Sequence, residues 1–201
     1  MILTEVSAPP AAAVPVRAFA GHLALGSGFE DDGSQDAVLE LYLRAAMAAI
    51  EARLGRVLLA REFSWSVSCW REAASQAIPV GPVRSVGSVT LVAADGEEEA
   101  VDPDSWSVVR DSQRPRLVGR FGRSLPRIPR SGRAEVRFTA GFGESWSEVP
   151  ADLRQAVFLL AAHYYENRSD TGTGPAAGSM PFGVLVLIDA YRTARLGGGG
   201  A

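Results

Sequence analysis

The sequence predicts an α+β fold in which helices from the two ends of the chain form a helical bundle and a small antiparallel β-sheet is inserted between them. Apolar residues recur every three or four positions in residues 34–54 and 150–168, which is the spacing of a helix with a buried face. Apolar and polar residues alternate in residues 61–71 and 134–140, which is typical of a half-buried strand. Because the order is helices, strands, helices, we expect the end segments to pack together while the sheet projects from them.

The segment 34–54 has more apolar surface than an ordinary surface helix. One apolar stripe runs along it and is widened on both sides, so that only Glu40, Arg44 and Glu51 share a polar face. The stripe consists of Leu39, Leu43, Ala46, Ile50 and Leu54, and the residues that widen it are Val38, Leu41, Tyr42, Ala45 and Ala49. Such a helix is covered on most sides, either as a central core helix or, in part, by a second copy of the chain.

Proline, glycine and composition shifts divide the rest of the chain. Pro15 suits the first position of a short helix over residues 16–25, and a last helix is expected over 184–196. In chain order the predicted parts are a flexible N-terminal arm (1–14), a helical core (15–60 and 145–168), a β-rich insertion (61–144), a flexible linker (169–181), and a C-terminal docking helix and tail (182–201).

Inside the β-rich insertion, strands are predicted where alternation or β-branched runs meet turn signals. They are expected over residues 61–71, 86–94, 99–101, 106–110 and 134–140. In the first of these, Phe63, Trp65, Val67 and Cys69 are expected to face the core. Residues 114–129 are interrupted by prolines and glycines and are expected to be mostly loop.

Length and composition fit one domain with room for a lobed second part. The chain has 201 residues, of which 47% are hydrophobic. The single cysteine excludes an internal disulfide and any multi-cysteine metal site, and it fits a reducing compartment. No secretory signal is visible and no apolar run approaches a membrane span, so we expect no membrane partner.

Charge is distributed unevenly along the chain. Residues 110–137 hold nine arginines against Asp111 and Glu135, a net charge of +7 in a chain whose total is −3. A bipolar chain can bind an anionic partner, either DNA or an acidic protein surface, and it can bind itself head to tail. The residues expected to face a partner or DNA are Arg114, Arg116, Arg120, Arg123, Arg127 and Arg130. The acidic residues expected at a subunit interface are Glu30, Asp31, Asp32, Glu97, Glu98 and Glu99.

No motif in the sequence indicates catalysis, a cofactor or a metal. His163 lies on a predicted helix without the partners of a zinc site, and no serine lies in a G-x-S-x-G elbow. The glycines of residues 141–143 follow a strand but lack the rest of a phosphate-loop pattern, so a plain turn is expected. The acidic run at 30–36 lacks the ligand alternation of a calcium loop. We therefore expect a non-enzymatic protein.

The ordered set of short motifs resembles the head–tail connector (adaptor) family of tailed phages and gene transfer agents. The resemblance extends over residues 14–196. Its pieces, in order, are Val14-Pro15-Val16 and a short helix ending in His22-Leu23; an acidic turn and an Ala-rich helix closing on Leu54-Gly55-Arg56-Val57-Leu58; the Asp95-Gly96 hairpin with Asp102-Pro103-Asp104-Ser105-Trp106; Thr139-Ala140-Gly141-Phe142-Gly143; Val149-Pro150-Ala151-Asp152-Leu153-Arg154-Gln155-Ala156; Tyr165-Glu166-Asn167-Arg168; and Pro181-Phe182-Gly183 with Tyr191-Arg192.

This resemblance implies a structural ring, usually dodecameric, in the neck of a virion or gene transfer agent particle, assembled from subunits made in the host cytoplasm. Its implied partners are other copies of the chain, the portal protein, and a stopper or tail protein, with double-stranded DNA passing through. Because the C-terminal segment commonly docks on the portal, the implied portal contacts are Phe182, Leu185, Tyr191, Arg192 and Arg195. For Leu185 and Tyr191, packing inside their own subunit is an equal alternative.

The alternative function is a DNA-binding module that uses the arginine-rich segment 110–137 to bind duplex phosphates. Phe121 is the one aromatic residue between those arginines, which argues against a platform that stacks single-stranded bases. The Gly-rich linker 169–181 favours the connector, because it would let the last helix reach a partner and become ordered on binding.

Overall fold

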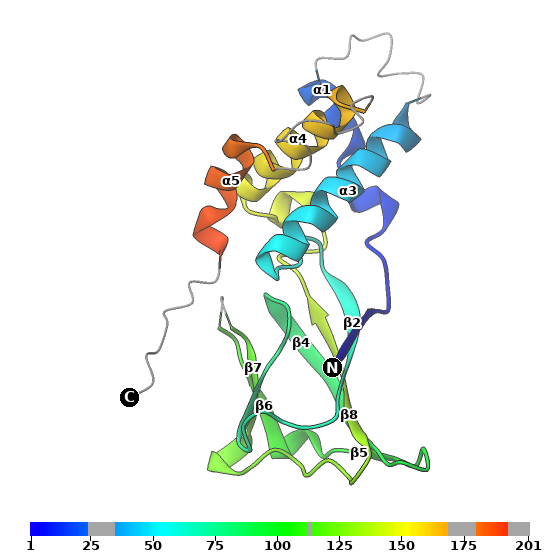
Figure 1. Ribbon diagram of the computed structural model, residues 1–201, viewed down its shortest axis with the longest axis vertical. Coiled ribbons are helices and arrows are strands. Elements are labelled where there is room, and N and C mark those ends of the chain that lie inside the picture. The colour runs from blue at the N-terminus through cyan, green and yellow to red at the C-terminus, as the bar shows by residue number, and fades with distance from the viewer. Residues whose placement is uncertain (24–34, 112–113, 169–179, 193–201) are drawn as a thin grey trace. The chain divides into compact units, whose positions relative to one another are not determined.

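The computed structural model describes residues 1–23, 35–111, 114–168 and 180–192. These residues form four α-helices and two antiparallel β-sheets, so the predicted α+β class is confirmed (Figure 1). The chain divides into two units. We call Met1–Pro10 with Gly55–Glu148 the β unit, and Ala11–Leu54 with Val149–Ala201 the helical unit.

The helical unit is built on α3 (Asp36–Leu54) and α4 (Ala151–Glu166), which pack along each other. The helix α1 (Val16–His22) packs against α3, and α5 (Phe182–Ile188) packs against α4 (Figure 1). A 3-10 turn, Asp189–Tyr191, follows α5 where the sequence predicted a continuous helix. Three predicted stretches lie wholly or partly outside the described residues. They are residues 169–179 of the linker, Ser34 at the start of the predicted α3 segment, and residues 193–201 of the C-terminal helix and tail.

The five residues of the predicted α3 stripe are all buried, with at most 5% of their surface exposed. At about 100° per residue they share one side of the helix with Met47, which is also buried. The apolar residues on the other side are covered only in part. Tyr42 and Ala49 are half-buried, whereas Val38 and Leu41 are 46% and 65% exposed and Ala45 is exposed as well. One apolar strip of α3 is therefore left exposed within one chain, and the rest of the predicted apolar surface is buried or half-buried.

The β unit contains two sheets that share one hydrophobic core. The larger sheet has the order β1 (Ile2–Glu5), β2 (Arg61–Val67), β8 (Arg133–Ala140), β4 (Val83–Val92), β5 (Glu98–Ala100). The smaller sheet has the order β3 (Ser75–Ala77), β7 (Arg116–Gly119), β6 (Trp106–Val109). Trp65 and Phe138 from the larger sheet and Leu117 from the smaller one belong to the same buried cluster.

Residues 2–5 are not part of a flexible arm, which corrects the prediction for this stretch. They form β1, which pairs antiparallel with β2 so that Leu3 lies opposite Trp65. Leu3 packs against the core, and Glu5 forms an ion pair of 2.9 Å with Arg61. The Ala/Pro-rich composition of the whole segment hid this short strand, because its partner lies some sixty positions away in the sequence.

A further prediction in the β unit is wrong. Cys69 does not face the core: β2 ends at Val67, and Cys69 is exposed beyond it. The segment 114–129 is mostly loop, as predicted, but it also contains the short strand β7, in which Leu117 is fully buried. The prolines of this segment flank the strand and leave its backbone free to pair on both sides.

Candidate docking surfaces

The arginine-rich segment is fixed to the smaller sheet. Leu125 is buried, and its backbone N donates to the Ala73 carbonyl at 2.7 Å. The Trp70 indole N donates to the Pro126 carbonyl at 2.7 Å, and the Gly119 N donates to the Ala74 carbonyl at 3.0 Å. These bonds hold the segment at both ends of a short 3-10 turn, Arg120–Gly122. Its side chains therefore project from a supported backbone.

Two of the six predicted arginines are engaged inside the β unit. Arg116 pairs with Glu72 at 2.8 Å, and Arg120 pairs with Asp104 at 3.2 Å. The Ser75 hydroxyl also donates to the Glu72 carboxylate, at 2.6 Å. The Ser75 bond first, and then the charge of Arg116, lower the pKa of Glu72 below its ordinary value. Arg116 and Arg120 therefore have part of their charge balanced within the chain.

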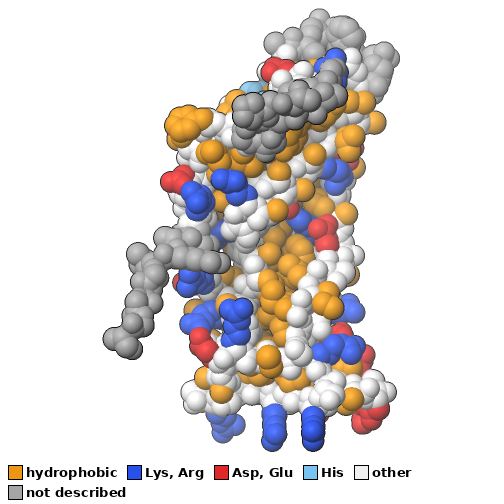
Figure 2. Space-filling model, in the orientation of Figure 1, with side chains coloured by type: hydrophobic (Ala, Val, Ile, Leu, Met, Phe, Trp, Pro, Cys, Tyr) orange, Lys and Arg blue, Asp and Glu red, His pale blue; other side chains and the backbone are white. Residues whose placement is uncertain are grey.

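The other predicted arginines are exposed. Arg114, Arg123, Arg127 and Arg130 form no ion pair among the residues that the structure describes. Figure 2 shows arginine side chains projecting outward from the β unit. Like charges held this close on a fixed backbone repel each other, so an anionic partner would stabilise them.

Phe121 lies between these arginines and was not selected from the sequence. Its side chain is 88% exposed, and its backbone has a φ of 56°, in the left-handed region. For a residue with a side chain that conformation costs roughly 1–2 kcal/mol. An exposed aromatic residue beside arginines is the composition of an interface hot spot. A single large apolar residue within a run of arginines and glycines was the sequence pattern that could have indicated Phe121 as a contact residue.

The predicted acidic residues are placed only in part. Glu97 lies in the turn between β4 and β5, and Glu98 and Glu99 lie in β5, where Glu99 is opposite Leu91; all three are exposed. The described residues include no ion-pair partner for these three carboxylates. Glu30, Asp31 and Asp32 lie outside the described residues. Both the acidic hairpin and the arginine segment belong to the β unit.

The predicted portal-contact residues fall into two groups. Phe182 is 81% exposed, and Arg192 is exposed and pairs with Asp189 at 3.1 Å. Leu185 and Tyr191 are half-buried, and the Tyr191 hydroxyl donates to the Asp152 carboxylate of α4 at 2.8 Å. The packing alternative therefore applies in part to these two residues. Arg195 lies outside the described residues.

Val186 belongs with Phe182, although sequence reasoning missed it. It is 58% exposed and lies four residues after Phe182, so both side chains are on one face of α5. The opposite face carries Val184 and Ile188, which are fully buried. The four-residue spacing in the sequence was the signal that could have revealed this exposed apolar pair.

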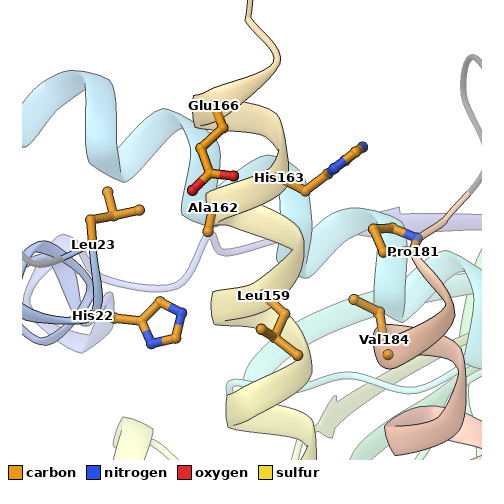
Figure 3. Close-up of a pocket in the computed structure, with 9 residues that line it drawn as sticks. His22, Leu23, Leu159, Ala162, His163, Glu166, Pro181 and Val184 are labelled. Atoms are coloured by element: carbon orange, nitrogen blue, oxygen red, sulfur yellow. The ribbon is translucent and has the colours of Figure 1, made fainter.

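A groove in the helical unit encloses about 410 Å³ between α1, α4 and α5. Its lining includes four aliphatic side chains, which we call the groove floor, from Leu23, Leu159, Ala162 and Val184, and polar side chains from His22, His163 and Glu166. Figure 3 shows His22 and Leu23 on one side of α4, with Pro181 and Val184 on the other. His163 Nδ1 lies 3.1 Å from the Asn167 amide, four residues further along the chain.

Metal-ligand clusters and membrane-length helices can be judged only for the described residues, and most of the acidic run 30–36 lies outside them. Within the described residues, no three His, Cys, Asp or Glu side chains are placed to hold a metal ion, and no helix could cross a bilayer. Gly141 has a φ of 140°, and a Cβ there would overlap the backbone of Ala60. The glycine therefore permits close packing of two backbone segments.

The turn after β8 is closed by the Glu148 carboxylate. It accepts the backbone N–H groups of Ser145 and Glu144, each at 2.9 Å, and the Ser145 hydroxyl at 3.0 Å. These bonds, with the Ser145 backbone bond the largest cause, lower the pKa of Glu148 below its ordinary value. Because the carboxylate already has three donors from its own chain, it is a structural group.

Solved structures similar to this chain come from gene transfer agent particles, two of them from the particle neck. A chain in the neck of an empty GTA particle, computed with C6 symmetry, is 50% identical with a TM-score of 0.88. A chain in the neck of a native GTA particle, computed with C12 symmetry, is 46% identical with a TM-score of 0.84. A chain in the virion of a native gene transfer agent (GTA) particle is 49% identical with a TM-score of 0.86. Each match covers 99% of both chains.

No protein-family model and no curated protein matches the chain. Identity near one half along the full length to chains of GTA particles, two of them from the neck, defines a structural protein of a particle neck. The chain belongs to the head–tail connector (adaptor) family of gene transfer agents and tailed phages. The resemblance inferred from the short motifs is thereby confirmed.

Proposed function

We propose that the chain is one subunit of a dodecameric ring that joins the portal to the stopper or tail of a gene transfer agent or phage particle. The observation that carries this proposal is the full-length match to chains from GTA necks, one of them computed with C12 symmetry. A ring of identical subunits needs two different contact surfaces on each copy. The separation of basic and acidic exposed residues in the β unit is consistent with such contacts.

In this proposal the C-terminal segment docks on the portal. The exposed pair Phe182 and Val186 supports it, because a solvent-facing aromatic beside a second apolar residue suits a hydrophobic contact. Leu185, Tyr191, Arg192 and Arg195 belong to the same proposed contact.

The β unit supplies the electrostatic contacts of the proposal. Arg114, Arg123, Arg127 and Arg130 face an acidic surface of the stopper or tail protein or of a neighbouring subunit, with Arg116 and Arg120 bordering them. Glu30, Asp31, Asp32 and Glu97, Glu98, Glu99 are assigned to the subunit interface. Exposed charges of opposite sign on one unit support a contact between copies.

The test of the ring proposal is deletion of the gene in a particle-producing strain. We expect DNA-filled or leaking heads without attached tails, and restoration of tailed particles when the intact gene is supplied. Electron microscopy of purified particles measures both. Normal tailed particles from the deletion strain would refute the proposal.

Docking on the portal is tested by surface substitution, because truncation before Val184 would remove two core residues, Val184 and Ile188. The variant Phe182→Glu leaves the buried face of α5 intact and places a charge on its exposed face. We expect loss of portal binding in a pull-down with a normal melting temperature. Ala151→Glu, a charge on an exposed alanine of α4, is the matched control and should bind normally.

The DNA-binding alternative rests on the exposed arginines. It predicts that the isolated protein binds duplex DNA with an affinity that falls steeply as salt rises. Replacing Arg127 and Arg130 by Glu would then abolish binding, whereas Val186→Glu would not. Absence of binding at low salt removes this function and leaves the arginines to a protein partner.

A further inference from the structure

The exposed side of α3 carries a regular apolar ridge. Val38, Leu41, Ala45, Ala48 and Ala52 follow each other at intervals of three and four residues, and all five are exposed. At 1.5 Å per residue the ridge is roughly 21 Å long. Val38 and Leu41 stand out at one end, while three alanines make the other end flat. This is the 3-4 spacing with which one helix packs along another.

The ridge and the groove lie on different sides of the helical unit. The ridge points away from the buried stripe of α3, by which that helix packs into its own unit. The groove is lined by Leu159, Ala162, His163 and Glu166, which share one face of α4. Figure 3 shows α3 passing behind α4, with the labelled groove residues lying along α4 and to either side of it. One unit therefore presents a convex apolar surface and a concave one in different directions.

We infer that the α3 ridge of one copy of this chain docks into the α1/α4/α5 groove of the next copy, with Val38 and Leu41 on the groove's apolar floor. This inference rests on the proposed ring and names a subunit contact within it. Two different surfaces facing different ways are what a head-to-tail contact requires, and repetition of that contact closes a ring when the rotation allows it.

A second copy is the occupant that the structure and the comparisons favour. Similar chains come from necks computed with C6 and C12 symmetry, and in a closed ring each subunit has two neighbours. The ridge lacks charge along its length, and the groove floor is aliphatic. Their contact would be hydrophobic and therefore little affected by salt, unlike the arginine and carboxylate contacts of the β unit.

The contact is tested by cross-linking in assembled particles. The exposed Cys69 is first replaced by Ser, and Ala45→Cys on the ridge is combined with Glu166→Cys at the groove rim. Neither substitution removes Leu41 or the groove floor. Particles are treated with a bismaleimide at high salt and run on a denaturing gel. We expect most of the chain to shift into a ladder of multimers extending to the full ring.

Three controls make the result specific. Ala45→Cys alone and Glu166→Cys alone should stay monomeric, because the inferred contact places the ridge of one copy against the groove of the next and not against another ridge. Ala45→Cys combined with Ala151→Cys places the second thiol at the other end of α4, roughly 22 Å from the groove rim, and should also give no ladder.

Failure of this inference is distinguishable from failure of the connector proposal. Particles that contain the double variant but give no ladder would overturn the ridge–groove contact and leave the connector proposal standing. Dimers from Ala45→Cys alone would also overturn it, because they would indicate a symmetric contact. Absence of the chain from purified particles would overturn both.

Discussion

At the scale of single residues, Phe121 combines backbone strain with full exposure of a large apolar side chain. Replacing it by Asn, which tolerates a positive φ better, should keep or raise the free energy of unfolding, by up to about 1 kcal/mol. The same variant should weaken attachment of the stopper or tail, because the exposed aromatic is lost. Urea denaturation and counts of tailed particles measure the two effects.

Ser131→Asn is the matched control for this change. Ser131 is also exposed and has a φ of 58°, so the substitution should affect stability in the same direction. It should leave attachment unchanged, because no apolar side chain is removed. If Phe121→Asn destabilised the protein by more than 1 kcal/mol, the side chain would have a packing role that its exposure does not indicate.

Glu148 gives a pH dependence with a definite sign. Its pKa in the folded protein lies below the ordinary value of 4.5, so its bonds to Ser145 and Glu144 stabilise the fold above pH 4.5. That contribution is lost as the pH falls through the lowered pKa. Glu148→Gln should therefore melt below the normal protein at pH 7, and the difference should shrink at pH 3. A difference that is independent of pH would contradict the role given to the carboxylate.

At the scale of elements, α3 offers two leucines with opposite surroundings on one helix. Leu43 is fully buried, and Leu43→Ala should lower the free energy of unfolding by about 2–5 kcal/mol because it leaves a cavity. Leu41 is 65% exposed, and Leu41→Ala should change it by less than about 0.5 kcal/mol. Urea denaturation of the dilute protein measures both. Similar effects at the two positions would contradict the placement of the helix.

Leu41 should matter for particle assembly although its effect on the free energy of unfolding is small. Leu41→Ala removes the largest side chain of the ridge, so fewer particles should carry a complete neck even though the chain is folded. Normal assembly with Leu41→Ala would count against the ridge as a subunit contact.

The sequence predicted the elements whose signal is local and periodic. The buried stripe of α3 and the alternation of Val136 and Phe138 in β8 are read directly from spacing, because each is set by burial of one face. The strand β1 and the ion pair between Arg116 and Glu72 depend on partners more than forty positions away. No local pattern carries that information, so these features were missed.

For the candidate surfaces, the sequence predicted which charged residues gather along the chain, and only the structure showed how their side chains are placed. A run of arginines is visible in the sequence, but whether an exposed arginine such as Arg120 has an ion-pair partner depends on where Asp104 lies in the fold. The groove combines residues from three helices. Its two histidines are 141 positions apart, so no motif scan would have joined them.

At the scale of the whole molecule, the chain is a structural part of a particle neck, and its function depends on its contacts with neighbouring proteins. The full-length likeness to chains of particle necks supports this, and the exposed apolar faces of α3 and α5 are surfaces that neighbours would cover. An isolated copy would leave these faces in water, which is unfavourable for contiguous apolar surface.

The most direct measurement is a reconstruction of the particle neck, without imposed symmetry, from particles in which every copy of the chain carries a small folded tag fused to the exposed Met1, which belongs to none of the proposed contacts. The account predicts one ring of identical copies between head and tail, with tag density repeated around it at equal angles. Necks of normal appearance that contain no tag density would contradict it.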